Sequence, residues 1–204
     1  PSRGSIETVK AITTEDLRGF MAKALARDRL TIGVVGDISA ADLGPLLDKT
    51  FGALPASTKI ATVPETMPKG AGLLKVVEKS IPQSRVMFGA PGLKRDDPDW
   101  YAAYVLNYVL GGGGFSSRLN EEVREKRGLA YSVYSYLYPL DHAAIHLGGV
   151  GTQNQRVEEA LKVIKEQIAR AGDAGITVDE LANAKTFLNG SFPLRLTSSG
   201  RIAR

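Results

Sequence analysis

The chain has 204 residues, of which 43% are apolar, and it contains no cysteine. This length and composition are ordinary for a globular protein with a real core. The missing cysteines exclude disulfides, thiolate metal sites and a cysteine nucleophile. The net charge of +4 is dispersed along the chain, which argues against nucleic-acid binding. No apolar run reaches the roughly 18 residues that a membrane helix needs.

The first predicted element is a helix from about Thr14, because Thr13 and Thr14 offer N-cap hydroxyls. Its apolar face is Leu17, Phe20, Met21, Ala24 and Leu25. The apolar run Leu30–Val35 is typical of a short buried strand, and Gly36 begins the turn after it. Ser39 is the expected cap of a second helix, whose stripe is Leu43, Leu46, Leu47 and Phe51.

The regular pattern breaks between Gly52 and Gly72, where prolines, threonines and glycines indicate an extended linker. We therefore predict a domain boundary in this segment. The expected organisation is a first piece at 1–54, a linker at 55–72 and a larger domain at 73–204.

Two strands, Leu73–Lys79 and Ser84–Ala90, are predicted at the start of the larger domain. Asp97-Pro98 is a good helix start. The following stretch, Trp100–Leu110, is apolar nearly all round, so we expect a deeply buried helix. Gly111–Gly114 should break this helix, since each glycine costs roughly 1 kcal/mol. Ser116 or Ser117 then restarts a helix that runs to about Lys126.

The rest of the chain predicts a hairpin and two helices. Leu129–Tyr138 and Ala143–Val150 have the composition of paired strands. A long amphipathic helix follows, with a stripe of Val157, Leu161, Ile164 and Ile168. Thr177 and Glu180 form a capping box that opens a last helix with the stripe Leu181, Ala184 and Leu188. The predicted class is α+β, with a mixed or antiparallel sheet packed against helices. The helical region ends unfinished at Arg204, as expected of an excised, truncated fragment.

The densest charged group, Arg118, Arg124, Lys126 and Arg127 interleaved with Glu121, Glu122 and Glu125, is interpreted as a solvated helix face. A phosphate-binding loop needs lysine after its glycines, and Phe115 stands there instead. The serine-hydrolase motif Gly-x-Ser-x-Gly does not occur either. The acidic group Asp96, Asp97 and Asp99 is explained by the start of a helix.

The chain has two histidines, His142 and His146, four residues apart. The residues between them are Ala143-Ala144-Ile145, so a glutamate that would serve as general base is missing. We interpret both as ordinary strand and turn histidines and predict no metal site in this chain.

The segment Leu110–Val133, LGGGGFSSRLNEEVREKRGLAYSV, closely resembles the second, non-zinc half of pitrilysin/insulinase-type metallopeptidases, including bacterial and mitochondrial processing peptidases. The resemblance extends to Pro82–Gly92, which looks like the first hairpin of that half. It also extends to Thr31–Gly52, which looks like the closing strand and helix of the preceding half. It implies a LuxS/processing-peptidase-like metallopeptidase-half architecture, in which residues 1–54 close the preceding unit and 73–204 form most of the next.

In this family, the resemblance implies, two homologous halves enclose a chamber. The first half carries zinc on an inverted His-x-x-Glu-His motif, and the second contributes an arginine and a tyrosine that reach the substrate. The matching residues here are Arg124 and Tyr131. A helix end and a strand start joined by a tight turn at Gly128 can direct both at one place, where both can donate to a carbonyl or oxyanion. The competing interpretation is a solvated arginine and a core tyrosine.

The same resemblance indicates that Gly111, Gly112, Gly113, Gly114 and Phe115 form a flexible loop where substrate backbone approaches closely. A purely structural helix–helix break is the alternative.

The resulting hypothesis is a substrate-binding half that is inactive by itself, because it lacks His-x-x-Glu-His. Zinc is expected in a homologous half or subunit, which would be its partner together with a peptide substrate. A scaffold subunit without proteolytic role is the alternative. Residues 1–54 are a candidate to fill the place of missing C-terminal elements, in cis or in a swapped homodimer. No export signal is present, and the compartment is left open, although bacterial relatives are often exported to the periplasm or beyond.

Overall fold

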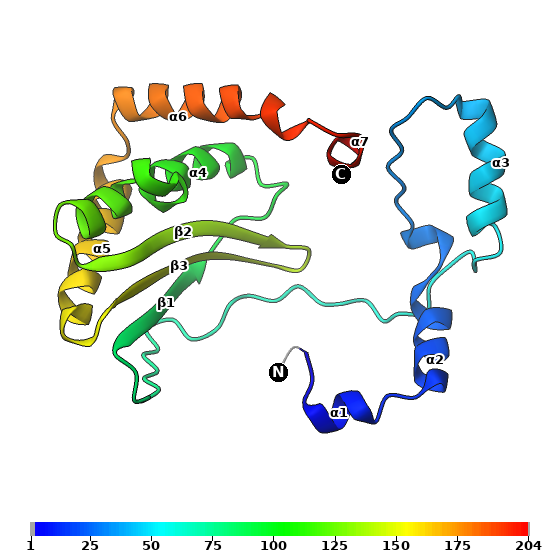
Figure 1. The fold of residues 1–204 in the computed structure, drawn as a ribbon, viewed down its shortest axis with the longest axis horizontal. Coiled ribbons are helices and arrows are strands. Elements are labelled where there is room, and N and C mark those ends of the chain that lie inside the picture. The colour runs from blue at the N-terminus through cyan, green and yellow to red at the C-terminus, as the bar shows by residue number, and fades with distance from the viewer. Residues whose placement is uncertain (1–2, 204) are drawn as a thin grey trace. The chain divides into compact units, whose positions relative to one another are not determined.

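The computed structural model describes residues 3–203. The chain divides into two compact units (Figure 1). The N-terminal unit comprises Pro1–Val63 with Pro193–Arg204, and the sheet unit comprises Pro64–Phe192. The assignment of 1–54, 55–72 and 73–204 to a preceding peptidase unit, a linker and a second peptidase domain stays a prediction. No helix among the described residues is long and apolar enough to cross a membrane.

The N-terminal unit is built from short helices: α1 (Ile6–Lys10), α2 (Thr14–Ala24), η1 (Arg27–Arg29), α3 (Ala40–Phe51), η6 (Pro193–Arg195) and α7 (Ser199–Ile202). The starts of α1, α2 and α3 are capped by side chains. At α2, the Thr13 hydroxyl accepts from the Asp16 amide and the Asp16 carboxylate accepts from the Thr13 amide. Ser39 caps α3 in the same way through the Asp42 amide. Both predicted helix starts are confirmed, because a cap is a local signal.

The predicted strand Leu30–Val35 is wrong: this segment is extended but unpaired, and its large apolar side chains are more than a third exposed. A strand needs a neighbouring backbone, which the composition of the segment itself does not supply. Helices α1, α2 and α3 bury none of their residues either. Among the described residues of this unit, Ala26 is the one buried residue.

The sheet unit contains a three-stranded antiparallel sheet of β1 (Gln83–Pro91), β2 (Ala130–Leu140) and β3 (Ala143–Gln153), in the order β1-β3-β2. The predicted hairpin and the predicted strand at Ser84–Ala90 are therefore confirmed. The predicted strand Leu73–Lys79 is wrong. It has no strand partner among the described residues, and its apolar side chains are at least 66% exposed.

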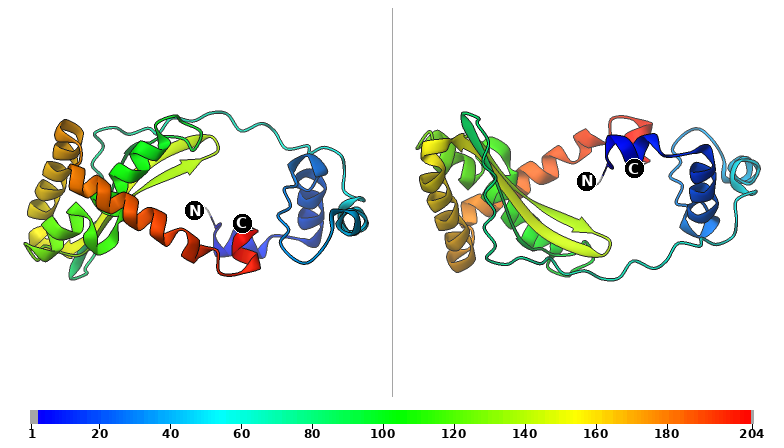
Figure 2. Two further views of the ribbon diagram at one scale, coloured as in Figure 1. Left: turned by 90° about the horizontal axis from the view of Figure 1, so that it is seen from above. Right: turned by 90° about the horizontal axis from the view of Figure 1, so that it is seen from below.

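Helices cover one face of this sheet (Figure 2). The helices of this unit are α4 (Trp100–Asn107), the π-helix η2 (Tyr108–Gly112), η3 (Gly114–Ser116), the π-helix η4 (Asn120–Glu125), η5 (Asn154–Arg156), α5 (Val157–Ala174) and α6 (Val178–Ser191). Among them, α4, η2, η4 and α5 contact the strands, and α6 packs on α4 and η2. Val133 and Val150 lie directly opposite each other on β2 and β3, and both belong to the core with Val163 and Ile164 of α5. Helices on one face of an antiparallel sheet confirm the α+β class.

The helical layer differs from expectation in three ways. Gly111 and Gly112 continue the helix as its π-helical end instead of breaking it. The helix before them is less buried than predicted, since Tyr101 is 75% exposed. The buried stripe of α5 is rotated from the predicted one, and its members are Ala160, Val163, Ile164, Gln167 and Ala171, with Ile168 exposed.

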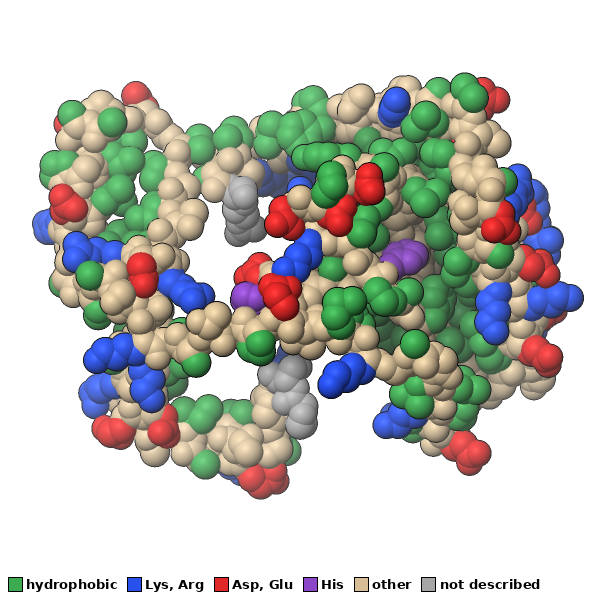
Figure 3. Space-filling view, turned by 180° about the vertical axis from the view of Figure 1, so that it is seen from behind, with side chains coloured by type: hydrophobic (Ala, Val, Ile, Leu, Met, Phe, Trp, Pro, Cys, Tyr) green, Lys and Arg blue, Asp and Glu red, His purple; other side chains and the backbone are tan. Residues whose placement is uncertain are grey.

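The opposite face of the sheet carries a row of tyrosines along β2. Tyr134 and Tyr136 stack with ring centres 6.1 Å apart, and Tyr138 meets Tyr136 edge to face. All three rings are more than a third exposed. Hydrophobic side chains are visible over much of the molecular surface in the space-filling view (Figure 3).

The outer edge of β2 is closed by two asparagines. Asn120 donates to the Val133 carbonyl at 3.4 Å, and Asn107 donates to the Ser135 carbonyl at 3.3 Å. Because carbonyls of alternate residues point to the same side of a strand, Pro139 presents its backbone to this edge too. Proline has no N–H to offer there. The edge strand is therefore protected from pairing with a further strand.

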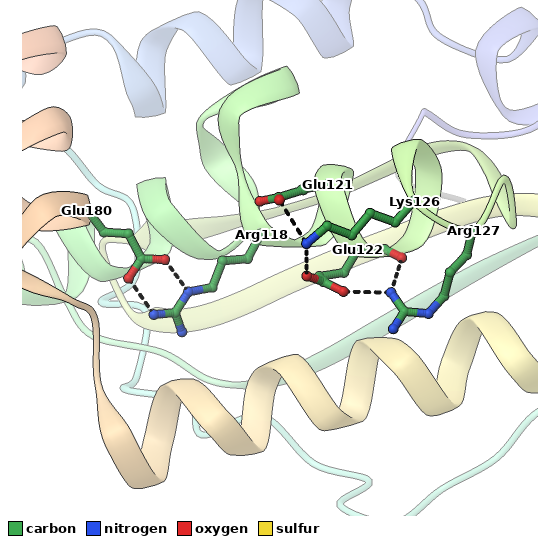
Figure 4. A network of polar contacts seen from close by, with 6 residues as sticks. All are labelled: Arg118, Glu121, Glu122, Lys126, Arg127 and Glu180. Carbon is green, nitrogen blue, oxygen red and sulfur yellow. Dashed lines mark hydrogen bonds and ion pairs between the residues drawn. The ribbon is translucent and has the colours of Figure 1, made fainter.

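One buried ion pair fixes η4 to α6. Arg118 is 7% exposed and donates through Nε and Nη2 to the two carboxylate oxygens of Glu180, each at 2.6 Å (Figure 4). Nη2 also donates to the Gly175 carbonyl at 3.1 Å. The interpretation of Arg118 as part of a solvated face is wrong, because its partner lies 62 residues away in the chain.

We predict that this pair makes the stability of the sheet unit depend on pH. The Arg118 guanidinium lowers the pKa of Glu180 from 4.5 to about 2. Since the folded pKa lies below the unfolded one, the stabilisation is complete above the unfolded pKa and is lost as pH falls toward the folded pKa. Allowing for solvent screening, we expect about 2 kcal/mol to be lost. Urea unfolding followed at several pH values measures it.

Glu180→Gln should remove this pH dependence, whereas Asp179→Asn, at the exposed neighbouring position, should retain it. If the free energy of unfolding of Glu180→Gln fell at acid pH as much as that of the parent, the prediction would be contradicted.

Candidate functional site

Arg124 and Tyr131 flank a tight turn whose backbone is fixed by hydrogen bonds. Gly128, with a positive φ of 58°, donates to the Arg124 carbonyl at 2.8 Å. Leu129 donates to the Val123 carbonyl at 2.9 Å, and Arg156 holds the Gly128 carbonyl at 2.8 Å. The left-handed conformation at Gly128 is one that glycine adopts without steric cost. The helix end and the strand start are thus joined rigidly.

Arg124 lies in the π-helical segment η4, where the Lys126 amide bonds to the Glu121 carbonyl five residues back. Its guanidinium stacks over the Phe115 ring, 4.8 Å from the ring centre. Glu125 is its closest ion-pair partner, at 3.7 Å, and the arginine side chain is 34% exposed. Short π-helical segments are frequent at functional sites.

The other basic residues of this helix are held by close ion pairs (Figure 4). Lys126 lies 2.9 Å from Glu121 and 2.8 Å from Glu122, and Arg127 lies 2.6 Å from Glu122. Hydrogen bonds from Lys126 and Arg127 lower the pKa of Glu122. These pairs confirm a charged surface at this end of the helix. Arg124 keeps donors available for a further partner.

Tyr131 sits at an irregularity of β2. The pairing register with β3 shifts between Ala130 and Ser132, so Tyr131 occupies a β-bulge. Its ring is 80% exposed, while Ala130 beside it is 8% exposed. Bulges redirect single side chains and are frequent next to active sites. The core-tyrosine interpretation is wrong for this residue.

The glycine segment, Gly111–Gly114, is mostly packed rather than open. A Cβ on Gly111 would lie 2.7 Å from the Ser135 amide nitrogen and 2.9 Å from Leu119, and one on Gly112 would lie 2.8 Å from the Asn107 amide group. Gly113 is packed against Tyr108 in the same way. Gly114 differs, because it has open space around it and a φ of +60°.

The structure brings Phe115 and Arg124 together, with Phe115 72% exposed. Among residues 3–203, no hydrogen bond joins Tyr131 to either of them. Two cavities of about 360 and 550 Å³ lie elsewhere, around the β2–β3 turn and Lys94, and no residue of the candidate site lines them. The candidate site is therefore an exposed surface.

The two histidines do not fit a zinc site. The Nδ1 of His142 faces Glu65 at 3.2 Å, and the Nε2 of His146 faces Asn107 at 3.0 Å. Within the described part of the chain, no group of three His, Cys, Asp or Glu side chains is arranged to hold a metal ion. Zinc requires three or four converging ligands, and neither histidine lies in such a group.

Sequence reasoning missed a buried polar group beneath the glycine segment. It consists of Asn107, Ser135 and His146, on α4, β2 and β3. The available signal was Asn107 itself, a lone amide in an otherwise apolar helical stretch, because buried amides are found where they have partners.

A family model described as the peptidase M16 inactive domain matches residues 11–188. The chain belongs to this family, which confirms the resemblance to pitrilysin-type metallopeptidases.

Relatives of known sequence and structure agree with this assignment. An uncharacterized zinc protease of Streptomyces coelicolor is 34% identical over 99% of this chain and 45% of its own length. A non-peptidase homolog of Helicobacter pylori is 36% identical over 94% of this chain and 44% of its own length. The crystal structure of a peptidase M16 inactive domain from Pseudomonas fluorescens is 32% identical, with a TM-score of 0.84 over 100% of this chain and 48% of that chain. This chain thus spans about half the length of the proteins it matches.

We predict that Gly111 and Gly114 respond differently to alanine. Gly111→Ala should cost about 2 kcal/mol or more, because its Cβ would overpack against β2. Gly114→Ala should cost about 1 kcal/mol, which is the steric cost of a positive φ. Urea unfolding of the sheet unit measures both. Equal costs would contradict the distinction between a packed and an open end of the segment.

Proposed function

We propose that the sheet unit is the substrate-positioning half of an M16 zinc protease, and that Arg124 and Tyr131 contact the peptide. Phe115 and the glycine segment would form the adjoining surface. The zinc and the catalytic base would come from another half of the same polypeptide or from a partner subunit.

The observation that carries this proposal is a difference in ion pairing among the basic residues of η4 and its flanks. Arg118, Lys126 and Arg127 each have a carboxylate partner within 3 Å. Arg124 has only a distant contact with Glu125 and a stacking contact with Phe115. A cation–π contact with a phenyl ring uses none of the conventional hydrogen-bond acceptors, so the N–H groups of Arg124 can still donate to a further partner.

The chemistry fits transition-state stabilisation. Hydrolysis of a peptide develops negative charge on the carbonyl oxygen, and donors placed in advance lower the energy of that state. A guanidinium and a phenol are both such donors. The rigid turn at Gly128 holds the two backbones in place before substrate arrives, so that little reorganisation is needed.

An exposed site also requires an opposing surface. Tyr131 is 80% exposed and the Arg124 side chain is 34% exposed, and neither residue lines the two cavities. Electrostatic contacts become strong only where water is excluded. A second half, in keeping with relatives about twice as long as this chain, would supply that exclusion.

A second candidate function is a scaffold subunit. It is favoured by the description of the Helicobacter pylori relative, 36% identical to this chain, as a non-peptidase homolog. In that case the chain would bind its partner half, but Arg124 and Tyr131 would not affect catalysis.

We predict that the chain alone does not cleave an internally quenched fluorescent peptide, and that zinc-dependent cleavage appears after mixing with a half that carries His-x-x-Glu-His. Tyr131→Phe should then lower kcat by roughly tenfold, since it removes one oxyanion donor. Steady-state kinetics and zinc analysis measure both. Stoichiometric zinc in the isolated chain, or an unchanged kcat in Tyr131→Phe, would refute the proposed role.

A matched pair of substitutions tests the arginine. Arg124→Lys keeps the charge but loses the planar fork, and we expect kcat/KM to fall by about tenfold or more. Arg127→Lys makes the same change three residues away, at a side chain already paired with Glu122. It should leave kcat/KM within about twofold of the parent. Equal effects of the two changes would favour the scaffold alternative.

A further inference from the structure

The polar group beneath the glycine segment is centred on the Asn107 side chain. Its Nδ2 donates to the Ser135 carbonyl at 3.3 Å, and its Oδ1 accepts from the Ser135 hydroxyl at 2.8 Å. The same Oδ1 lies 3.0 Å from the Nε2 of His146. Asn107 is 9% exposed and Ser135 is 2% exposed, so these bonds have little competition from water.

The chemistry of these partners fixes the orientation of the amide and the tautomer of the histidine. The Ser135 carbonyl can only accept, so it must face Nδ2. Oδ1 then faces both the Ser135 hydroxyl and His146, and both must donate to it. His146 therefore carries its proton on Nε2. Burial lowers the pKa of His146, in agreement with a neutral ring.

The backbone of the glycine segment rests directly on this group. Gly111 lies against Ser135, and Gly112 lies against the Asn107 amide, so close that neither position has room for a Cβ. The Gly113 amide closes the π-turn on the Tyr108 carbonyl at 2.8 Å. The next residues form η3, which carries Phe115, and Ser117 ties it down through a 2.7 Å bond to the Gly114 carbonyl.

We infer that Asn107 is a positioning residue. Its carboxamide joins α4 to β2 and β3 and so fixes the distance between the glycine segment and the sheet. This distance places Phe115 under Arg124. The inference rests on the proposed function insofar as Phe115 and Arg124 are taken to meet substrate. The placement itself does not depend on that function.

Asn120 provides a matched comparison within the same fold. It is 8% exposed and its amide also donates to an outward carbonyl of β2, that of Val133. Its amide is not among the three atoms nearest to a Cβ at any glycine of the segment, whereas the Asn107 amide nitrogen is the nearest at Gly112. Loss of either amide removes one bond to the edge of β2, but loss of Asn107 also removes the amide nitrogen nearest to Gly112 and the acceptor of the Ser135 hydroxyl, against which Gly111 lies.

The experiment begins with the unaltered chain. Long-range ¹H–¹⁵N spectra report the tautomer of each histidine, and His142→Gln assigns the two signals. We expect the His146 signal to be that of the Nε2–H form. A dominant Nδ1–H form would overturn the inference without any variant of Asn107.

Amide hydrogen exchange across residues 110–117 is then compared in Asn107→Ala and Asn120→Ala. In Asn107→Ala we expect exchange in the segment to accelerate by about tenfold relative to the core strands, because hydrogen bonds that close it are lost, and His146 should populate both tautomers. In Asn120→Ala the segment and His146 should behave as in the parent. Equal acceleration in both variants, or none in Asn107→Ala, would overturn the inference.

Kinetics with the zinc-bearing half separate the two proposals. Both proposals are supported if three results agree. Asn107→Ala must alter the exchange and the tautomer, and it must lower kcat/KM. Arg124→Lys must then reduce kcat/KM by a smaller factor in the Asn107→Ala background than in the parent. If the exchange and the tautomer change while cleavage is insensitive to both Asn107 and Arg124, Asn107 positions the segment as inferred and the proposed function is wrong.

Discussion

The close approach of the Gly111–Gly112 backbone to β2 is the constraint on which the arrangement of the candidate site depends. It is possible because neither residue has a side chain, and it lets the end of one helix lie directly on Asn107 and Ser135. The residues that follow Gly112 therefore begin at a fixed distance from the sheet. Phe115 is carried to the surface beside η4, where Arg124 stacks on it. The glycines thus contribute packing at one end of the segment and conformational freedom at the other, at Gly114.

Ion pairing separates the basic residues of η4 and its flanks into those with a close carboxylate partner and Arg124, which has none within 3 Å. The buried Arg118–Glu180 pair fixes the helix to α6, and the exposed pairs of Lys126 and Arg127 neutralise its C-terminal end. Arg124 has a longer ion-pair contact, 3.7 Å to Glu125, and a weakly paired surface cation is usually explained by solvation. Here it lies across a rigid turn from an exposed tyrosine on a β-bulge, in a family whose inactive domains accompany zinc proteases. That combination favours a contact with substrate over solvation alone.

The sequence predicted the elements whose signals are local. The helix start capped by Thr13, the capping box at Thr177 and the hairpin before α5 were all found where expected. The strands at Leu30–Val35 and Leu73–Lys79 were not, because pairing depends on a neighbouring backbone that composition does not reveal. The positions of Arg124 and Tyr131 came from a resemblance, and the structure adds the stacking and the bulge. The roles of Arg118 and Asn107 depend on residues 28 to 62 positions away, which no short pattern can indicate.

Because the outer edge of β2 is closed, the sheet can be extended only at its other edge, beside β1. The outward carbonyls of Val133 and Ser135 are already bonded to asparagines, and Pro139 offers no N–H, so an incoming strand finds no regular ladder on that side. Additional strands, whether from a companion half or from misassembly with another molecule, would have to join beside β1. The two asparagine amides that close this edge, Asn107 and Asn120, therefore also oppose polymerisation of the sheet, at the side where the candidate site is exposed.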